Sequence, residues 1–177
     1  MSRSLSMRAG FAADLLTATR LGLALPIFFA AGMGFSEPVA VMLAAAWWTD
    51  FFDGHLARRA GGKTRLGDLD TFADVTIASA LLAGEVAAGT PPLWGAVGLV
   101  LLAMFVARHN TVWCVLLQAV AYGLVLARLL TDAPVWSVLP LMTALTMLWL
   151  NRQRFIGEFL PRLVGTIAPA VGTARKA

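Results

Sequence analysis

The chain has 177 residues, of which 59% are hydrophobic and only 14% are charged, and its formal net charge is +4. A water-soluble domain of this size needs more charge to cover its surface, so the composition excludes an ordinary soluble protein and favours one membrane domain over residues 1–177. The single cysteine excludes an intramolecular disulfide, and the basic residues lie at the ends of apolar runs, which does not indicate binding of nucleic acid.

Six apolar runs predict an all-α fold with six transmembrane helices, since each run is close to the roughly 20 residues that a bilayer core requires. In chain order these runs cover residues 13–34, 38–59, 70–89, 92–108, 111–130 and 133–151. Turn-forming or charged stretches separate them. Residues 3–12 and 154–163 are expected to form short interfacial helices at the two termini.

The distribution of lysine and arginine predicts the orientation of the helices. If the N-terminus lies inside the cell, Arg128 is the only basic residue on the outer side, and the other basic residues all lie on the inner side. This bias is typical of a multi-pass protein. We therefore expect an integral protein of the cell (inner or plasma) membrane with both termini in the cytoplasm.

Four carboxylates interrupt the second and third apolar runs. Asp50 and Asp53 are three residues apart near the end of the second run, and Asp70 and Asp74 are four residues apart at the start of the third. Each pair therefore shares one helix face. A short loop joins the two helices, so we expect them to be antiparallel and the four carboxylates to converge near the inner interface. Charges inside a span are costly, which makes each one a functional hypothesis.

Four neighbouring carboxylates repel one another, and divalent cations would relieve that repulsion. Ligation by oxygen alone favours magnesium, manganese or calcium over zinc. Gly54 leaves room for a bulky group such as a diphosphate, and Arg58 can engage its oxygens. Polar packing between two helices, or an ion pathway in a transporter, would also explain the carboxylates.

The stretch from Asp50 to Asp74 resembles the signature D-x2-D-G-x2-A-R-x8-G-x3-D-x3-D of the CDP-alcohol phosphatidyltransferases. Here it reads Asp50-x2-Asp53-Gly54-x2-Ala57-Arg58-x8-Gly67-x2-Asp70-x3-Asp74. One residue is missing after Gly67, so a strict register would place Thr71 and Val75 at the last two positions. We prefer Asp70 and Asp74, because they keep the spacing of one helix face and the missing residue then only shortens the loop. Asp68 is left without a role.

This resemblance implies a mechanism and a set of site residues. Asp50, Asp53, Asp70 and Asp74 would hold two Mg²⁺ or Mn²⁺ ions, and Asp74 would also be the general base. The residues expected to line the CDP site are Gly54, Ala57, Arg58 and Gly67. The substrates would be CDP-diacylglycerol and a small alcohol, with CMP as the leaving group. The implied partners are membrane lipids and, as in many members of the family, a second copy of the chain.

A shorter motif narrows the expected acceptor. The stretch Leu15-Leu16-Thr17-Ala18-Thr19-Arg20 through Pro26 resembles the pattern N-L-L-T-x-x-R-x5-P of phosphatidylglycerophosphate synthases and related cardiolipin synthases, with Asp14 in place of the asparagine. Glycerol 3-phosphate would then be the acceptor, and basic side chains would be needed to bind its phosphate. The candidates for this role on the inner side are Arg20, Lys63, Arg65, Arg108, Arg152 and Arg154.

Three alternatives stay open on the sequence. The same chemistry can use phosphatidylglycerol, inositol phosphate or serine as the acceptor. A non-enzymatic protein that binds or transports divalent cations would also need carboxylates, but near the bilayer midplane and across several spans. The missing residue before Asp70 is compatible with a catalytically inactive scaffold.

Overall fold

The computed structural model describes residues 3–59, 69–108, 111–154 and 157. The described residues form helices and no strand, which confirms the all-α class. The helices are α1 (Arg3–Gly32), α2 (Ser36–Arg59), α3 (Asp70–Ala87), α4 (Pro92–Arg108), α5 (Thr111–Asp132), α6 (Pro134–Leu150) and α7 (Arg152–Arg154). The first six coincide within a few residues with the six apolar runs, except at the beginning of α1.

Two of these helices contain segments long and apolar enough to cross a membrane, Gly10–Gly32 and Val112–Asp132. Shorter apolar helices cover Pro92–Ala107 and Pro134–Leu150. Helices α2 and α3 carry the four aspartates, which lower their hydropathy. Membrane-spanning helices are therefore supported, while the count of six spans and their orientation stay predictions.

The expectation of a separate interfacial helix over residues 3–12 is wrong. Helix α1 runs without a break from Arg3 to Gly32. Gly10 alone does not end a helix, and no proline or turn-forming pair stands between residues 3 and 13. The interfacial helix expected over residues 154–163 lies almost entirely outside the described residues.

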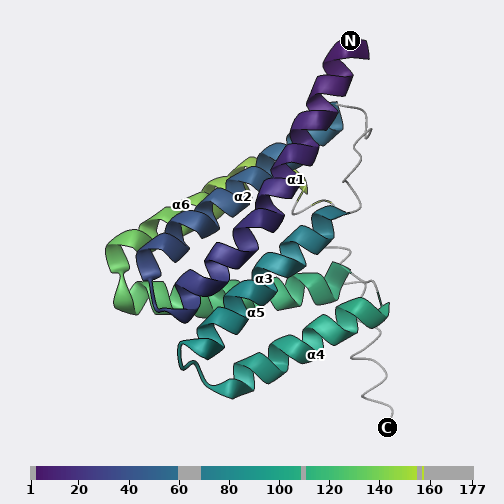
Figure 1. Ribbon diagram of the computed structural model, residues 1–177. Coiled ribbons are helices and arrows are strands. Elements are labelled where there is room, and N and C mark those ends of the chain that lie inside the picture. The colour runs from purple at the N-terminus through teal and green to yellow at the C-terminus, as the bar shows by residue number, and fades with distance from the viewer. Residues whose placement is uncertain (1–2, 60–68, 109–110, 155–156, 158–177) are drawn as a thin grey trace. The chain divides into compact units, whose positions relative to one another are not determined.

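The chain divides into two compact units, Met1–Thr143 and Ala144–Ala177, with the boundary inside α6. In the first unit α1 packs against α2 and α3, and α3 also packs against α4 and α5 (Figure 1). The core between these helices is apolar, and its largest fully buried members include Ile27, Leu43, Ile77, Leu81 and Leu117. In the second unit the Arg152 guanidinium carbon lies 5.8 Å from the centroid of a Trp149 ring.

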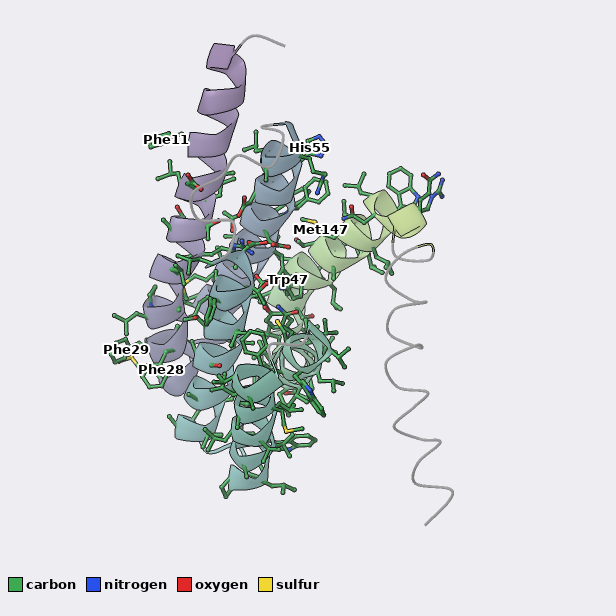
Figure 2. All side chains as sticks on the ribbon, turned by 90° about the vertical axis from the view of Figure 1, so that its right-hand side faces the viewer. Phe11, Phe28, Phe29, Trp47, His55 and Met147 are labelled. Carbon is green, nitrogen blue, oxygen red and sulfur yellow. The ribbon has the colours of Figure 1, made fainter. Side chains whose placement is uncertain are left out.

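Large apolar side chains cover much of the outer surface. Phe11 and Phe29 of α1, for example, are 72% and 51% exposed and point away from the helices (Figure 2). Soluble monomers rarely leave large contiguous apolar patches open to water. This surface therefore agrees with lipid as the surrounding medium.

A buried ion pair joins α3 and α5 at the end of the first unit where α1 turns into α2. Glu85, in the last turn of α3, is buried and lies 2.9 Å from Arg128 Nη1. Arg128 Nε lies 3.1 Å from the Asp132 carboxylate one turn further along α5. Gly34, in the α1–α2 turn, has a φ of 76°, which glycine adopts without steric cost.

Helices α1 and α3 approach each other closely at Gly84. A Cβ atom at this position would lie 2.6 Å from Ala31 Cβ and 2.8 Å from the Phe28 carbonyl oxygen. Small residues allow such backbone contact between helices in a membrane, where the hydrophobic effect does not press helices together. The absence of a side chain at Gly84 therefore sets the distance between α1 and α3.

We expect Gly84→Ala to destabilise the protein by about 1–3 kcal/mol, because backbone atoms cannot move aside as the end of a side chain can. The matched control is Gly22→Ala in α1, where a Cβ would meet nothing within 4 Å. This control should leave stability unchanged or raise it, since alanine favours a helix over glycine by about 1 kcal/mol. Thermal unfolding in detergent micelles measures both, and equal midpoints for the two variants would contradict the close approach.

Candidate active site

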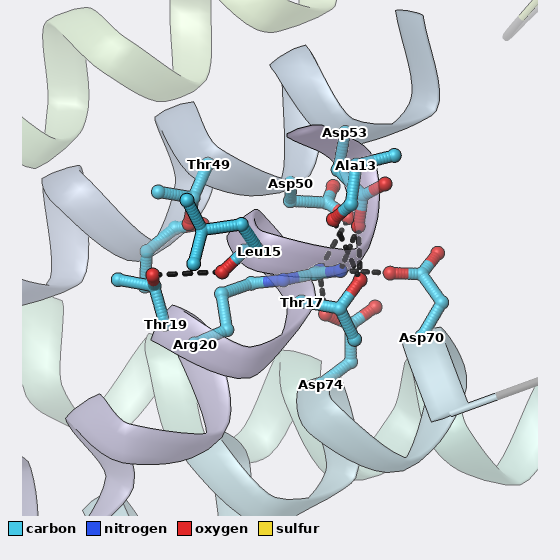
Figure 3. A network of polar contacts seen from close by, with 11 residues as sticks. Ala13, Leu15, Thr17, Thr19, Arg20, Thr49, Asp50, Asp53, Asp70 and Asp74 are labelled. Atoms are coloured by element: carbon cyan, nitrogen blue, oxygen red, sulfur yellow. Dashed lines mark hydrogen bonds and ion pairs between the residues drawn. The ribbon is translucent and has the colours of Figure 1, made fainter. Parts of the chain in front are cut away.

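The four aspartates of the motif surround one arginine side chain. Asp50 and Asp53 lie in the second half of α2, and Asp70 and Asp74 lie in the first two turns of α3. The guanidinium of Arg20, in the middle of α1, sits between these two pairs (Figure 3). The Arg20 side chain is only 1% exposed. Three helices therefore meet at one buried cation.

Both terminal nitrogens of Arg20 contact carboxylate oxygens. Nη1 lies 2.6 Å from Asp50 Oδ1 and 2.7 Å from Asp74 Oδ1. Nη2 lies 3.0 Å from Asp53 Oδ2 and also pairs with Asp70 Oδ1. Each terminal nitrogen thus contacts one carboxylate from α2 and one from α3. The structure therefore brings together all four aspartates that the sequence singled out.

Thr71 and Val75, the two positions of the strict motif register, do not face this cluster. Thr71 is exposed, and Val75 is buried in the apolar core of the first unit. Asp70 and Asp74, one turn apart, both reach Arg20. Asp70 and Asp74, and not Thr71 and Val75, are therefore the residues of α3 that face the cluster.

Two further residues lie beside the carboxylates, and sequence reasoning did not assign them to the site. The buried Thr17 hydroxyl, one turn before Arg20, lies 2.6 Å from Asp53 Oδ2. The Gln118 side chain of α5 lies close enough to the Asp74 carboxylate to interact with it. A signal for Thr17 was present, because it lies three residues before Arg20 in the first-helix motif and so shares its face. Gln118 lies in an apolar run without any motif.

The charges of the cluster do not balance. Four carboxylates face one guanidinium, and Arg20 contacts only one oxygen of each. The Asp50, Asp70 and Asp74 side chains are 50%, 43% and 28% exposed, so they can be reached from outside the bundle. Uncompensated carboxylates among apolar helices are unfavourable. The cluster can therefore accept additional positive charge.

The donor set suits hard divalent cations, which prefer carboxylate oxygens. Within residues 3–59, 69–108, 111–154 and 157, however, no three acidic, histidine or cysteine side chains already stand in an arrangement that would hold a metal ion. In Figure 3 the carboxylates are instead gathered around the Arg20 guanidinium.

The residues expected around the nucleotide follow Asp53 on α2. A Cβ at Gly54 would lie 3.2 Å from Arg58 Nη1, so the space beside this glycine is next to the Arg58 guanidinium. Arg58 is exposed and Ala57 is half-buried. Gly67 lies outside the described residues.

The basic residues that were expected to bind the phosphate of the acceptor are only partly described. Lys63 and Arg65 lie outside the described residues, and of Arg108 and Arg154 only the helical backbone is described. Arg152 is exposed and belongs to the second unit. Of the two candidates whose side chains are described, Arg20 and Arg152, only Arg20 lies among the carboxylates.

The fold and the site define a helical protein of membrane character with an acidic centre enclosed by apolar helices. The family model of the CDP-alcohol phosphatidyltransferases matches residues 11–173, and the chain belongs to this family. It is therefore an enzyme that transfers a substituted phosphate group from a CDP-alcohol to an alcohol acceptor, as in phospholipid biosynthesis. Searches of curated proteins and of solved structures gave no match. The narrower resemblance to phosphatidylglycerophosphate synthases stays a prediction.

The hydrogen bond from Thr17 to Asp53 can be tested by Thr17→Val, which keeps the shape and removes the hydroxyl. We expect a loss of about 1.5–3 kcal/mol of stability, because a hydrogen bond to a charged group is stronger than a neutral one. Thr19→Val is the matched control, since the Thr19 hydroxyl is exposed and lies 2.8 Å from the Leu15 carbonyl oxygen of its own helix. Thermal unfolding in micelles compares them; an equal loss in both variants would argue against the Asp53 contact.

Proposed function

We propose that this enzyme transfers a phosphatidyl group from CDP-diacylglycerol to a small alcohol, with glycerol 3-phosphate as the expected acceptor and CMP as the second product. The observation that carries the proposal is the convergence of Asp50, Asp53, Asp70 and Asp74 in a chain that belongs to this family. The active site would open toward the cytoplasm, because the basic residues predict that side for the end of α2 and the start of α3.

The four aspartates are the proposed ligands of two divalent cations, Mg²⁺ or Mn²⁺. Members of the family depend in general on divalent metals, and the excess of negative charge around Arg20 supports the same need here. When bound, such cations neutralise the diphosphate and polarise its phosphorus–oxygen bonds.

Asp74 is the proposed general base. Its carboxylate is partly exposed, so an acceptor hydroxyl can approach it, and Arg20 holds it in place. In the proposed step the acceptor oxygen bonds to the lipid-side phosphorus while the bond from that phosphorus to the CMP oxygen breaks. The hydroxyl proton passes to Asp74, and CMP leaves with the electrons of the broken bond.

Residues on the last turns of α2 are proposed to bind the nucleotide. Gly54 and Ala57 lack bulky side chains, and the Arg58 guanidinium stands beside Gly54, where it can meet phosphate oxygens. The phosphate of the acceptor would be bound by basic residues of the inner side. Lys63, Arg65, Arg108, Arg152 and Arg154 remain the candidates for that role.

The proposal predicts CMP release from CDP-diacylglycerol in the presence of Mg²⁺, with glycerol 3-phosphate as the best acceptor. Purified protein in micelles would be given a panel that also contains phosphatidylglycerol, inositol phosphate and serine. Chelation of the metal by EDTA should stop the release, and added Mg²⁺ or Mn²⁺ should restore it. A folded sample that releases no CMP with any acceptor would contradict the proposal. A higher rate with another acceptor would change only the assignment of the acceptor and would leave the transferase activity standing.

Asp74→Asn should lower turnover by about 100-fold or more, because general-base catalysis contributes on this scale and an amide cannot accept the proton. The matched control is Asp132→Asn, which makes the same change at the end of α5 in an exposed carboxylate paired with Arg128. The control should keep normal turnover in the same CMP assay. Near-normal turnover in folded Asp74→Asn would refute this assignment of the base.

A further inference from the structure

Arg20 and any bound cation need the same oxygens. The guanidinium contacts one oxygen of each of the four carboxylates from the motif, and the three distances that define its position lie between 2.6 and 3.0 Å. No other basic side chain among the described residues pairs with these four aspartates. A divalent cation that binds these oxygens is also repelled by the guanidinium at the same short range.

The surroundings of Arg20 make this competition hard to avoid. Its side chain is buried and held on α1, so it cannot simply turn into water as a surface arginine would. Its Nε is buried and has no hydrogen-bond partner among the described residues, so its present contacts satisfy only the terminal nitrogens. Arg20 is thus held by the four carboxylates through its terminal nitrogens alone.

We propose that Arg20 is an internal counterion that competes with divalent cations for Asp50, Asp53, Asp70 and Asp74. In the absence of cations it holds the carboxylates of α2 and α3 together against their mutual repulsion. Each cation that binds must displace the guanidinium from part of its contacts, so the protein binds the metal more weakly than the carboxylates alone would. The inference rests on the proposed function, because it takes these carboxylates to be the cation site.

The test measures binding of Mn²⁺ alone to the full chain in micelles, after treatment with EDTA, for the unchanged protein and for Arg20→Gln. We expect Arg20→Gln to bind Mn²⁺ about tenfold more tightly or better, because one unit of repelling charge a few ångströms away is gone. Without Mn²⁺ the variant should unfold at a lower temperature than the unchanged protein. Saturating Mn²⁺ should close most of that gap, since a ligand stabilises the folded state that binds it.

Arg128→Gln is the matched control, because it removes an arginine from an acidic pair at the other end of the first unit. Its affinity for Mn²⁺ should equal that of the unchanged protein, even if it unfolds at a lower temperature. Asp53→Asn should weaken Mn²⁺ binding, which locates the bound ion at the cluster.

The outcomes separate the two proposals. Equal or weaker Mn²⁺ binding by Arg20→Gln overturns the counterion role and leaves the metal site standing. No specific binding by the unchanged protein or by Arg20→Gln overturns both the counterion role and the proposed two-metal chemistry. If Arg20→Gln does not fold, Arg20→Lys takes its place with Arg128→Lys as control: a single ammonium cannot contact all four carboxylates, so tighter Mn²⁺ binding is still expected, and an unchanged affinity overturns the inference.

Discussion

The contact between one guanidinium and four carboxylates governs the arrangement of α1, α2 and α3. Carboxylates on two neighbouring helices repel one another, and the cost is greater among apolar helices than in water. Arg20 relieves that repulsion only if α1 lies against both other helices at the depth of Asp50 and Asp74. The packing of α1 against α2 and α3 and the support from Thr17 both follow this requirement.

Packing away from the acidic centre relies on small residues and one more ion pair. Gly84 lets α3 approach the backbone of α1, and the buried pair of Glu85 with Arg128 fastens α3 to α5 near the α1–α2 turn. In a lipid environment, helices associate through close packing and polar contacts, because the hydrophobic effect does not drive them together as it does in water. Polar contacts at two levels along α3 therefore join the helices on either side of an apolar core, and further apolar side chains face outward.

The same residues serve stability and the proposed chemistry, and the two demands conflict. A cluster of acids is required to hold cations and to accept a proton, yet that cluster destabilises the bundle that contains it. Arg20 reconciles the two if its contacts are strong enough to assemble the helices and can still yield to a more highly charged ion. A guanidinium suits this role, since it offers several donors in one plane and remains charged at any physiological pH.

The sequence by itself determined the helices and the family. Apolar runs bounded by turn residues set the limits of α2 to α6, and the local spacing of Asp50 with Asp53 and of Asp70 with Asp74 placed each pair on one face, because such features depend only on neighbours along the chain. The continuity of α1, the pairing of Glu85 with Arg128 and the proximity of Gln118 to Asp74 were not predicted. The position of Arg20 was decided only by the tertiary structure, since its partners lie 30 to 54 residues away in the sequence and only the packing of three helices brings their charges within reach of one another.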